Sequence, residues 1–495
     1  MSAPTLVVGF DRKRLAALVR ATLGQASPLV LSRLCSAVLT FALPLVLVRL
    51  LDPTAFGTYK QFFLISQTLL LVGQLGLTQS LYYFLPRGGE ERGAYVTHAL
   101  VALSALGALF GAALYALAPW LGARLGSGEL GDLRAPLALY SALMLAAAPL
   151  EGALTSESRI GKAALAYVLT DALRAGALIA GAKLFGSIGI FWAAAVVALL
   201  RVAALAALVA RGILPHSRPS WSALRKQLAF ALPFAGAMWL YVGQRYFSQY
   251  AVSARFDAAT FALFAVASFH LPVVDIVFTP ITEVLMVRLG RAHGGGSQAA
   301  MLAEWDDAVN KLASLLLPAA CGAWLLGPTV LPLLFTHKYA GAVPLFMLAT
   351  VEIPLWILPC DALLRAAGDT RFLFAFYGAR VGISAGCVLG GIWLFGLPGA
   401  LGGAIVSEAL SRACLMLRGR RFLGVAFGEL LDWPSLARIA TASVGASLPA
   451  YAVRFAVAPG AVMIVASVAV YGAAYLALRA ALKPKPRTAC VTATA

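Results

Sequence analysis

Long apolar runs separated by short polar connections dominate this chain from residue 28 to residue 482. Each run has roughly 20 residues, the helical length that crosses the hydrocarbon core of a bilayer. The alternating segments of ~10 residues that form outer-membrane barrels do not occur. The pattern predicts an all-α polytopic membrane protein with about 14 transmembrane helices, at 28–50, 58–84, 95–118, 134–154, 163–184, 188–210, 228–252, 259–287, 308–332, 340–363, 372–395, 398–417, 436–457 and 459–481.

The stretch from Leu43 to Arg87 predicts an apolar helix, a tight turn and a second apolar helix. Asp52 and Pro53 mark the turn, because proline ends the first helix and aspartate caps the start of the next. Amide side chains are costly in contact with lipid, so we expect the amide-bearing face of the second helix to meet protein or water. These amides belong to Gln61, Gln67, Gln74 and Gln79.

The same hairpin carries a family resemblance. It reads R-L-L-D-P-x-x-F-G-x-Y from Arg49 to Tyr59, followed by G-L-x-x-S-L-Y-Y-F-L-P-R from Gly76 to Arg87. This motif resembles that of polysaccharide-transporter flippases in the multidrug/oligosaccharidyl-lipid/polysaccharide exporter superfamily, which move undecaprenyl-linked sugars. The resemblance implies two helical bundles whose equivalent first helices line a central cleft, and a transport cycle in which the bundles rock.

An internal repeat points to the same layout. Asp52, Phe56 and Tyr59 recur at an offset of 205 as Asp257, Phe261 and Phe264. At an offset of 210, residues Pro149, Glu151, Leu154, Tyr167, Gly176, Gly181, Leu184–Gly186 and Gly189 pair with Pro359, Asp361, Leu364, Tyr377, Gly386, Gly391, Leu394–Gly396 and Gly399. Chance agreement between alanine- and glycine-rich helices is the alternative explanation. A true repeat predicts two pseudo-symmetric six-helix bundles of the same orientation.

The repeat and the polar connections together divide the chain. Two helices follow the second bundle and lie outside the repeat. The predicted parts are a cytoplasmic amphipathic N-terminus (1–27), the N-terminal bundle (28–210), a cytoplasmic linker (211–227), the C-terminal bundle (228–417), a cytoplasmic loop (418–435), helices 13 and 14 (436–482) and a cytoplasmic tail (483–495).

Charge fixes the expected orientation. The chain is 61% hydrophobic and 12% charged, with a formal net charge of +18. Twenty-four lysines and arginines fall in segments on one side of the predicted spans and eight on the other. Because cytoplasmic loops of membrane proteins are enriched in basic residues, both termini are predicted to lie in the cytoplasm. The family resemblance implies that the membrane is a bacterial inner membrane. The basic cytoplasmic segments explain the positive net charge, so a nucleic-acid partner is not predicted.

No pattern of an enzyme or a cofactor site emerges. The chain has no P-loop and no zinc-ligand spacing, and its six cysteines form no CxxC pair. The longest connection on the outer side, Pro119 to Leu133, has about fifteen residues. A polysaccharide polymerase or ligase needs a larger aqueous surface. The sequence therefore predicts a protein that is not an enzyme, with no cofactor and no metal.

Ionisable side chains inside predicted spans are the candidates for function, because a charge at mid-membrane costs at least ~2.5 kcal/mol unless it is solvated or paired. Asp171 with Arg174 and Glu408 with Arg412 have the spacing of local helical pairs. Arg33 and Arg245 have no opposite charge within four residues. They fall in the helices that the resemblance assigns to the cleft, and arginine has a donor fork that suits pyrophosphate. Snorkelling towards the nearest membrane surface is the alternative for both.

Aromatic and amide side chains surround Arg245, as expected of a cavity that handles sugars. The predicted substrate-binding residues are Arg245, Arg33, Gln244, Tyr241, Arg174 and Arg380. Asp275 and Glu352 have no adjacent base, so they are candidates for coupling a cation or proton to transport, or for pairing with arginines across the bundle.

The function that the resemblance implies, and that the embedded arginines favour, is translocation of a polyprenyl-pyrophosphate-linked oligosaccharide across the cytoplasmic membrane. The expected partners are that lipid-linked substrate, the bilayer and a coupling cation or proton. The alternatives are a peptidoglycan-precursor or drug/cation exporter of the same superfamily, and a membrane polymerase or ligase. A purely structural scaffold would leave the embedded charges unexplained.

Overall fold

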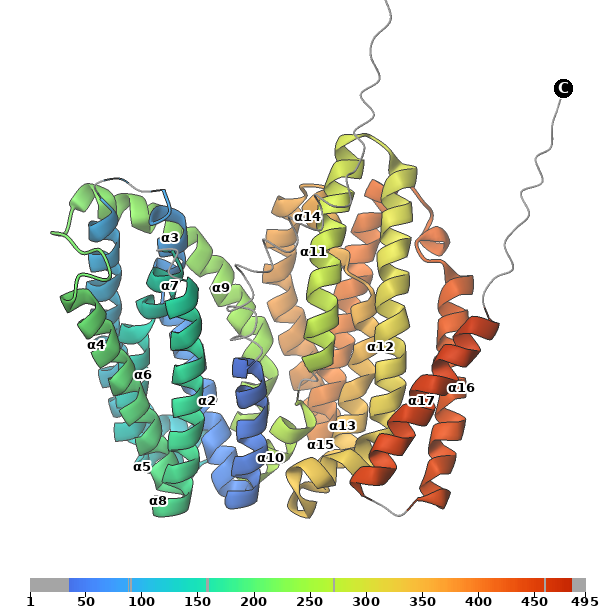
Figure 1. The fold of residues 1–495 in the computed structure, drawn as a ribbon, viewed down its shortest axis with the longest axis horizontal. Helices are drawn as coiled ribbons and strands as arrows, with labels where there is room; N and C mark the ends of the chain where they lie inside the picture. Colours follow the sequence, from blue (N-terminus) through green and yellow to red (C-terminus); the bar gives the residue numbers. More distant parts are fainter. Residues whose placement is uncertain are drawn as a thin grey trace, which may run out of the picture. The chain divides into compact units, whose positions relative to one another are not determined.

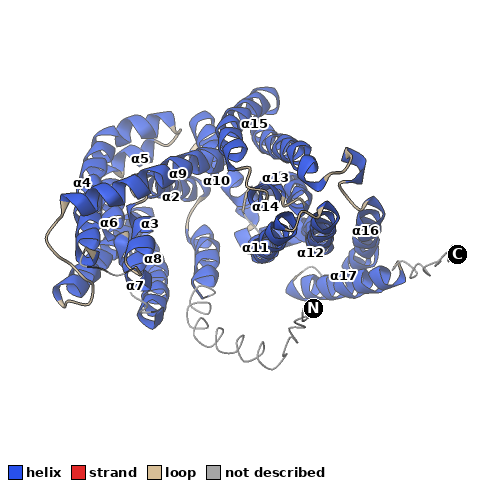
Figure 2. Ribbon diagram, turned by 90° about the horizontal axis from the view of Figure 1, so that it is seen from above, coloured by secondary structure: helices blue, strands red, loops and turns tan. Residues whose placement is uncertain are grey.

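The computed structural model describes residues 35–87, 89, 91–156, 160–269, 272–457 and 460–482, without the side chains of 151, 160–167, 272–276 and 427. Throughout these residues the regular secondary structure is helical (Figure 2). This confirms the all-α prediction. The chain forms two compact units, Met1–Trp239 and Leu240–Ala495, so their boundary falls inside one long helix, α9 (Trp221–Arg255).

The first unit begins with a described helix at Cys35–Leu50. It continues with α2 (Pro53–Gly73), α3 (Leu77–Phe84), α4 (Arg92–Arg124), α5 (Gly128–Asp132), α6 (Arg134–Ala147), α7 (Pro149–Ser156), α8 (Ile160–Ala210) and the first part of α9.

Helices α4, α6 and α8 run side by side in this unit (Figure 1). Small residues let α4 and α6 approach closely, since a Cβ on Gly107 would lie 2.6 Å from the carbonyl oxygen of Ala142. The first part of α9 is held by polar contacts as well as packing. Its buried Gln227 donates to Ser80 Oγ at 2.8 Å and to the carbonyl of Tyr95 at 3.2 Å.

The second unit contains the rest of α9 and eight further α-helices. They are α10 (Ala258–Ala267), α11 (Pro272–Gly294), α12 (Gln298–Phe335), α13 (Ala342–Ala349), α14 (Cys360–Ala366), α15 (Thr370–Leu423), α16 (Trp433–Ala456) and α17 (Ala461–Ala481). Short 3-10 turns lie between them at η1 (His337–Tyr339), η2 (Thr350–Ile357) and η3 (Phe427–Glu429).

The core of the second unit gathers buried side chains from α11, α12, α14, α15 and α16. Trp305 is fully buried there, and its indole NH donates to the carbonyl of Leu430 at 2.9 Å. The last two helices, α16 and α17, pack as a pair against α12. Tyr475 of α17 donates to the carbonyl of Ser314 on α12 at 2.8 Å, which joins the pair to the rest of the unit.

Seven helices among the described residues are long and apolar enough to cross a membrane, or eight if α2 and α3 count as one bent span. The chain is therefore a multi-pass membrane protein. Two of these helices, α8 and α15, have 51 and 54 residues, and each is long enough for two passes. The count of 14 spans stays a prediction.

Both long helices are broken at a glycine. Gly186 in α8 has φ 67° and ψ −153°, and Gly396 in α15 has φ 64° and ψ −135°. Glycine is essentially the only residue that adopts this region of backbone space. The two glycines are 210 positions apart, so the sequence repeat coincides with a repeated backbone feature in each unit.

The two members of the other repeat pair cap equivalent helices. Asp52 accepts a hydrogen bond from the backbone NH of Ala55 at 2.7 Å and starts α2. Asp257 accepts from Thr260 N at 3.0 Å and starts α10. Both aspartates thus satisfy NH groups that a helix leaves unpaired at its first turn.

The single span predicted at 58–84 is bent in the structure. Helices α2 and α3 meet at an angle of 48°. Leu75 and Gly76 between them have positive φ, and a Cβ on Gly76 would collide with the carbonyl oxygen of Ala231 on α9. Within the bent segment Gln61 is fully buried and donates to the carbonyl of Leu125 at 2.7 Å, as expected of an amide turned towards protein.

Candidate functional site

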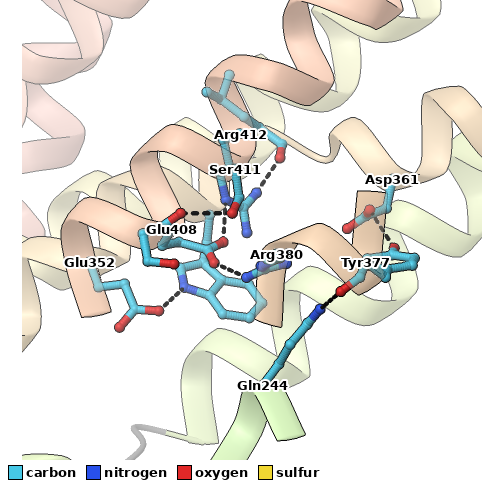
Figure 3. A network of polar contacts seen from close by, with 11 residues as sticks. Gln244, Glu352, Asp361, Tyr377, Arg380, Glu408, Ser411 and Arg412 are labelled. Atoms are coloured by element: carbon cyan, nitrogen blue, oxygen red, sulfur yellow. Dashed lines mark hydrogen bonds and ion pairs between the residues drawn. The ribbon is translucent and has the colours of Figure 1, made fainter. Parts of the chain in front are cut away.

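A network of polar side chains lies inside the second unit, where η2, α14 and the two arms of α15 meet (Figure 3). We call residues 370–395 the first arm of α15 and residues 397–423 the second arm, because the break at Gly396 separates them. Arg380 comes from the first arm, and Glu408 and Arg412 come from the second.

Glu408 accepts hydrogen bonds from both arginines. Its Oε1 lies 2.7 Å from Arg412 Nε, and its Oε2 pairs with Arg380 Nη2. The side chains of Glu408 and Arg412 are 10% and 9% exposed, whereas that of Arg380 is 21% exposed. We refer to these three residues as the triad. With all three ionised, it carries one surplus positive charge in an apolar bundle.

The glycine break is what brings the triad together. Arg380 and Glu408 are 28 residues apart in sequence. A straight α-helix rises 1.5 Å per residue, so 28 residues would separate them by about 42 Å. The reversal at Gly396 instead lays the second arm along the first.

Arg412 has further partners on η2 and the segment that follows it. Its Nη1 donates to the carbonyl of Leu358, and its guanidinium carbon lies 5.0 Å from the centre of the Trp356 ring. The carbonyl of Leu358 follows the 3-10 turn η2, outside the hydrogen-bond ladder of an α-helix. Trp356 in turn donates its indole NH to Glu352 Oε1 at 3.4 Å. The network therefore runs from Glu352 through Trp356 and Arg412 to Glu408 and Arg380.

A second polar group lies beside the triad (Figure 3). The hydroxyl of Tyr377 donates to Asp361 Oδ1 at 2.6 Å, and Arg365 Nη2 lies 3.5 Å from the same hydroxyl. The backbone carbonyl of Tyr377 accepts from Gln244 Nε2 at 2.8 Å. Gln244 is thus fixed to the first arm of α15, one turn from Arg380.

The remaining predicted site residues fall in different places. Arg245 and Tyr241 are exposed on the part of α9 that belongs to the second unit. Arg174 belongs to the first unit, where it pairs with Asp171 at 3.5 Å and donates to Thr40 Oγ1 at 3.5 Å. Arg33 lies outside the described residues, and the side chain of Asp275 does too. Among the predicted residues that the structure describes, Arg380 and Glu352 thus belong to one network, and Gln244 contacts the same arm of α15 one turn from Arg380.

Sequence reasoning treated Glu408 and Arg412 as a local pair that satisfies itself. The pair exists, but Arg380 from the other arm joins it. Glu352, considered as a coupling group or an arginine partner, reaches Arg412 through the indole of Trp356. The contact between Asp361 and Tyr377 was missed, although both residues appeared in the repeat.

The triad is suited to binding an anion. Two guanidinium groups share one carboxylate, so NH donors and one positive charge are available to a ligand. Hydrogen bonds from guanidinium to phosphate are among the strongest in proteins. In the part of the chain that the structure describes, no group of three or more His, Cys, Asp or Glu side chains is placed to hold a metal ion.

Comparison with known proteins gives the fold a context. A family model described as polysaccharide biosynthesis protein matches residues 46–344. A solved structure of the lipid II flippase MurJ in an inward closed conformation is 13% identical, covers 90% of this chain and 98% of its own, and has a TM-score of 0.70. An inward-facing multidrug resistance MATE transporter of the MOP superfamily is 18% identical over 78% of this chain and 94% of its own, with a TM-score of 0.62.

A MATE transporter from Vibrio cholerae is also similar, at 14% identity over 84% of this chain and 99% of its own, with a TM-score of 0.55. No curated protein matches the chain in sequence. At these identities the structural matches show a shared fold. The chain has the helical fold of these flippases and transporters.

Proposed function

The chain belongs to the polysaccharide biosynthesis protein family, and from this premise we propose that it is a flippase for a polyprenyl-pyrophosphate-linked oligosaccharide. It would translocate this molecule across the bacterial inner membrane by alternating access, for the synthesis of cell-surface polysaccharide. The fold that it shares with a lipid II flippase and with MATE transporters supports a transport role.

The observation that carries the proposal is the surplus positive charge of the triad. Burying charges in a bundle is costly even when they are paired, and here two guanidinium groups share the single carboxylate of Glu408. Substrate binding would explain why the charge is kept. A pyrophosphate headgroup needs fixed positive charge within the membrane, since an unsolvated anion there costs many kcal/mol.

Residues on α9 extend the proposed binding surface. Arg245 is exposed, and no carboxylate among the described residues forms an ion pair with it. Gln244 and Tyr241 beside it supply an amide and an aromatic ring, which suit hydroxyl-rich sugars. In the first unit, Arg33 and Arg174 are separate proposed cationic positions for the substrate.

Orientation and coupling are part of the proposal. The distribution of lysine and arginine supports cytoplasmic termini, with the headgroup entering from the cytoplasm. Glu352 and Asp275 are the proposed coupling carboxylates. Of the two, Glu352 has the contact that supports such a role, because it reaches the triad through Trp356 and Arg412.

Complementation of a bacterial strain that lacks its own flippase tests the proposal. We expect Arg245→Ala to abolish export of the lipid-linked glycan while membrane levels stay normal. Arg245→Lys should restore part of the activity, because lysine keeps the charge and loses the bidentate fork. Arg255→Ala, at the end of the same helix, is the matched control and should export normally.

Two results would contradict the proposal. Full export by both Arg245→Ala and Arg33→Ala would show that these positions do not bind the headgroup. Normal export by Arg245→Gln together with loss of export by Asp275→Asn would instead favour a drug/cation exporter of the same superfamily.

A further inference from the structure

The two arginines of the triad are held very differently. Arg412 has three partners: Glu408, the carbonyl of Leu358 and the face of Trp356. In the described structure Arg380 has one ion-pair partner, Glu408, and its side chain is more than twice as exposed as that of Arg412. If a ligand competed for one of these arginines, Arg380 would be the one to move.

The hairpin does not need the triad in order to fold. At the repeat offset of 210, the positions of Arg380, Glu408 and Arg412 correspond to Thr170, Ala198 and Val202 on α8. Helix α8 has the same glycine break, and Ala198 is fully buried in it. The backbone reversal therefore does not require charges at these three positions, although α8 carries charges at others: Asp171, Arg174 and Arg201.

We propose that Glu408 is an internal counter-ion, and that Arg380 exchanges it for a phosphate group of the substrate. In the empty protein Glu408 neutralises Arg380. When an anionic headgroup arrives, Arg380 turns to a phosphate oxygen and Glu408 stays paired with Arg412. The inference rests on the proposed function, because it assigns a part in substrate binding to Glu408, which is not among the predicted binding residues.

The exchange avoids an unpaired charge at every stage. Before binding, the guanidinium of Arg380 has a carboxylate partner, so the empty site does not bear the cost of an isolated cation. After binding, Glu408 keeps its hydrogen bond from Arg412 Nε at 2.7 Å. Because Glu408 competes with the phosphate for the same donor, it weakens binding and thereby favours release of the headgroup.

Binding of inorganic pyrophosphate to the purified full-length chain in nanodiscs tests the exchange. Arg380→Gln leaves the Glu408–Arg412 pair in place and should bind pyrophosphate about tenfold more weakly, the loss expected of one charge-assisted contact. Glu408→Gln removes the competitor and should bind about tenfold more tightly. Asp369→Asn is the matched control, since Asp369 precedes α15 and pairs with Arg418 at 2.7 Å rather than with the triad; its affinity should equal that of the wild type.

The outcomes separate the exchange from the proposed function. Wild-type affinity in Arg380→Gln, or weaker binding by a folded Glu408→Gln, overturns the exchange. If Glu408→Gln fails to fold, Arg380→Gln alone decides, because it keeps the buried pair. Should the predicted affinities be found while the wild-type gene fails to restore glycan export, the exchange stands and the flippase assignment is wrong. Normal export by the wild type, with the same pyrophosphate affinity in every variant, would support the flippase assignment and overturn the exchange.

Discussion

Helices α8 and α15 have the same backbone and different interiors. Each reverses at a glycine with positive φ, and in each a pair of glycines eight residues apart packs backbone against backbone: Gly181 with Gly189, and Gly391 with Gly399. Between the arms, α8 has Thr170, Ala198 and Val202 where α15 has the charged triad. Glycine thus fixes the reversal in both helices, whereas the positions of the charges differ: α8 carries Asp171, Arg174 and Arg201, and α15 carries the triad.

This difference separates architecture from function within one molecule. A feature found in both units supports folding, since both must form it. A costly feature found in one unit needs a separate reason to be there. On this criterion the glycine pairs are structural, and the triad, whose three positions are uncharged in α8, is the candidate site. Substitutions at equivalent positions of the two helices test the distinction.

Arg412→Ala should have the largest effect on stability. It removes one partner from a buried ion pair and leaves Glu408 with only Arg380, so we expect a loss of about 3–5 kcal/mol. Val202→Ala at the equivalent position of α8 should cost no more than about 1.5 kcal/mol, the value for removing small apolar groups. Unfolding in a denaturing detergent measures both. Equal losses of unfolding free energy in Arg412→Ala and Val202→Ala would show that the triad contributes no more to stability than the apolar contacts at the same position of α8.

Much of this fold could be predicted from local sequence. Apolar runs predicted helices, Asp52 predicted a helix start, and the repeat paired Gly186 with Gly396, where the structure has equivalent breaks. These features depend on a few neighbouring residues, so a sequence displays them directly. The bend at Gly76 was missed because it depends on a contact with Ala231, far along the chain.

The candidate site was predictable only in part, for the same reason. Spacing identified the i,i+4 pair of Glu408 and Arg412, and it identified Arg380 as an embedded charge. Spacing did not show that Arg380 contacts Glu408. The two residues are 28 positions apart, and their distance in space depends on the reversal at Gly396. The repeat contained the missing signal: a helix that folds back at this glycine brings residues of its two arms together.

Gly399→Ala should have an intermediate effect, and it should be shared by both units. A Cβ at this position would collide with the carbonyl oxygen of Gly391, and overpacking of this kind costs about 1–3 kcal/mol. Gly189→Ala should destabilise α8 similarly, because its Cβ would collide with Gly181. Gly402→Ala has open space around it on the same arm of α15 and is the control. A melting temperature that falls for Gly399→Ala but not for Gly189→Ala would show that the two glycine breaks are not equivalent.

The smallest effect is expected at a carboxylate that meets its base in water. Glu91, which precedes α4, accepts from Lys226 Nζ at 2.9 Å, Ser222 Oγ at 3.0 Å and Tyr95 OH at 2.8 Å. These hydrogen bonds, that of Lys226 above all, lower the pKa of Glu91 from 4.5 to about 2. Unlike the triad, this group is solvated, and exposed ion pairs contribute little.

Glu91→Gln should therefore lower the melting temperature at pH 7 by less than either substitution above. A carboxyl whose pKa is depressed in the folded protein stabilises it above its ordinary pKa, and that contribution is lost as the pH falls through the folded value. The deficit of Glu91→Gln relative to the wild type should accordingly be constant above about pH 5 and shrink between pH 4.5 and 2. Lys226→Met should show the same pH dependence, because it removes the other partner. A deficit that stays constant down to pH 2 would show that Glu91 acts through packing rather than charge.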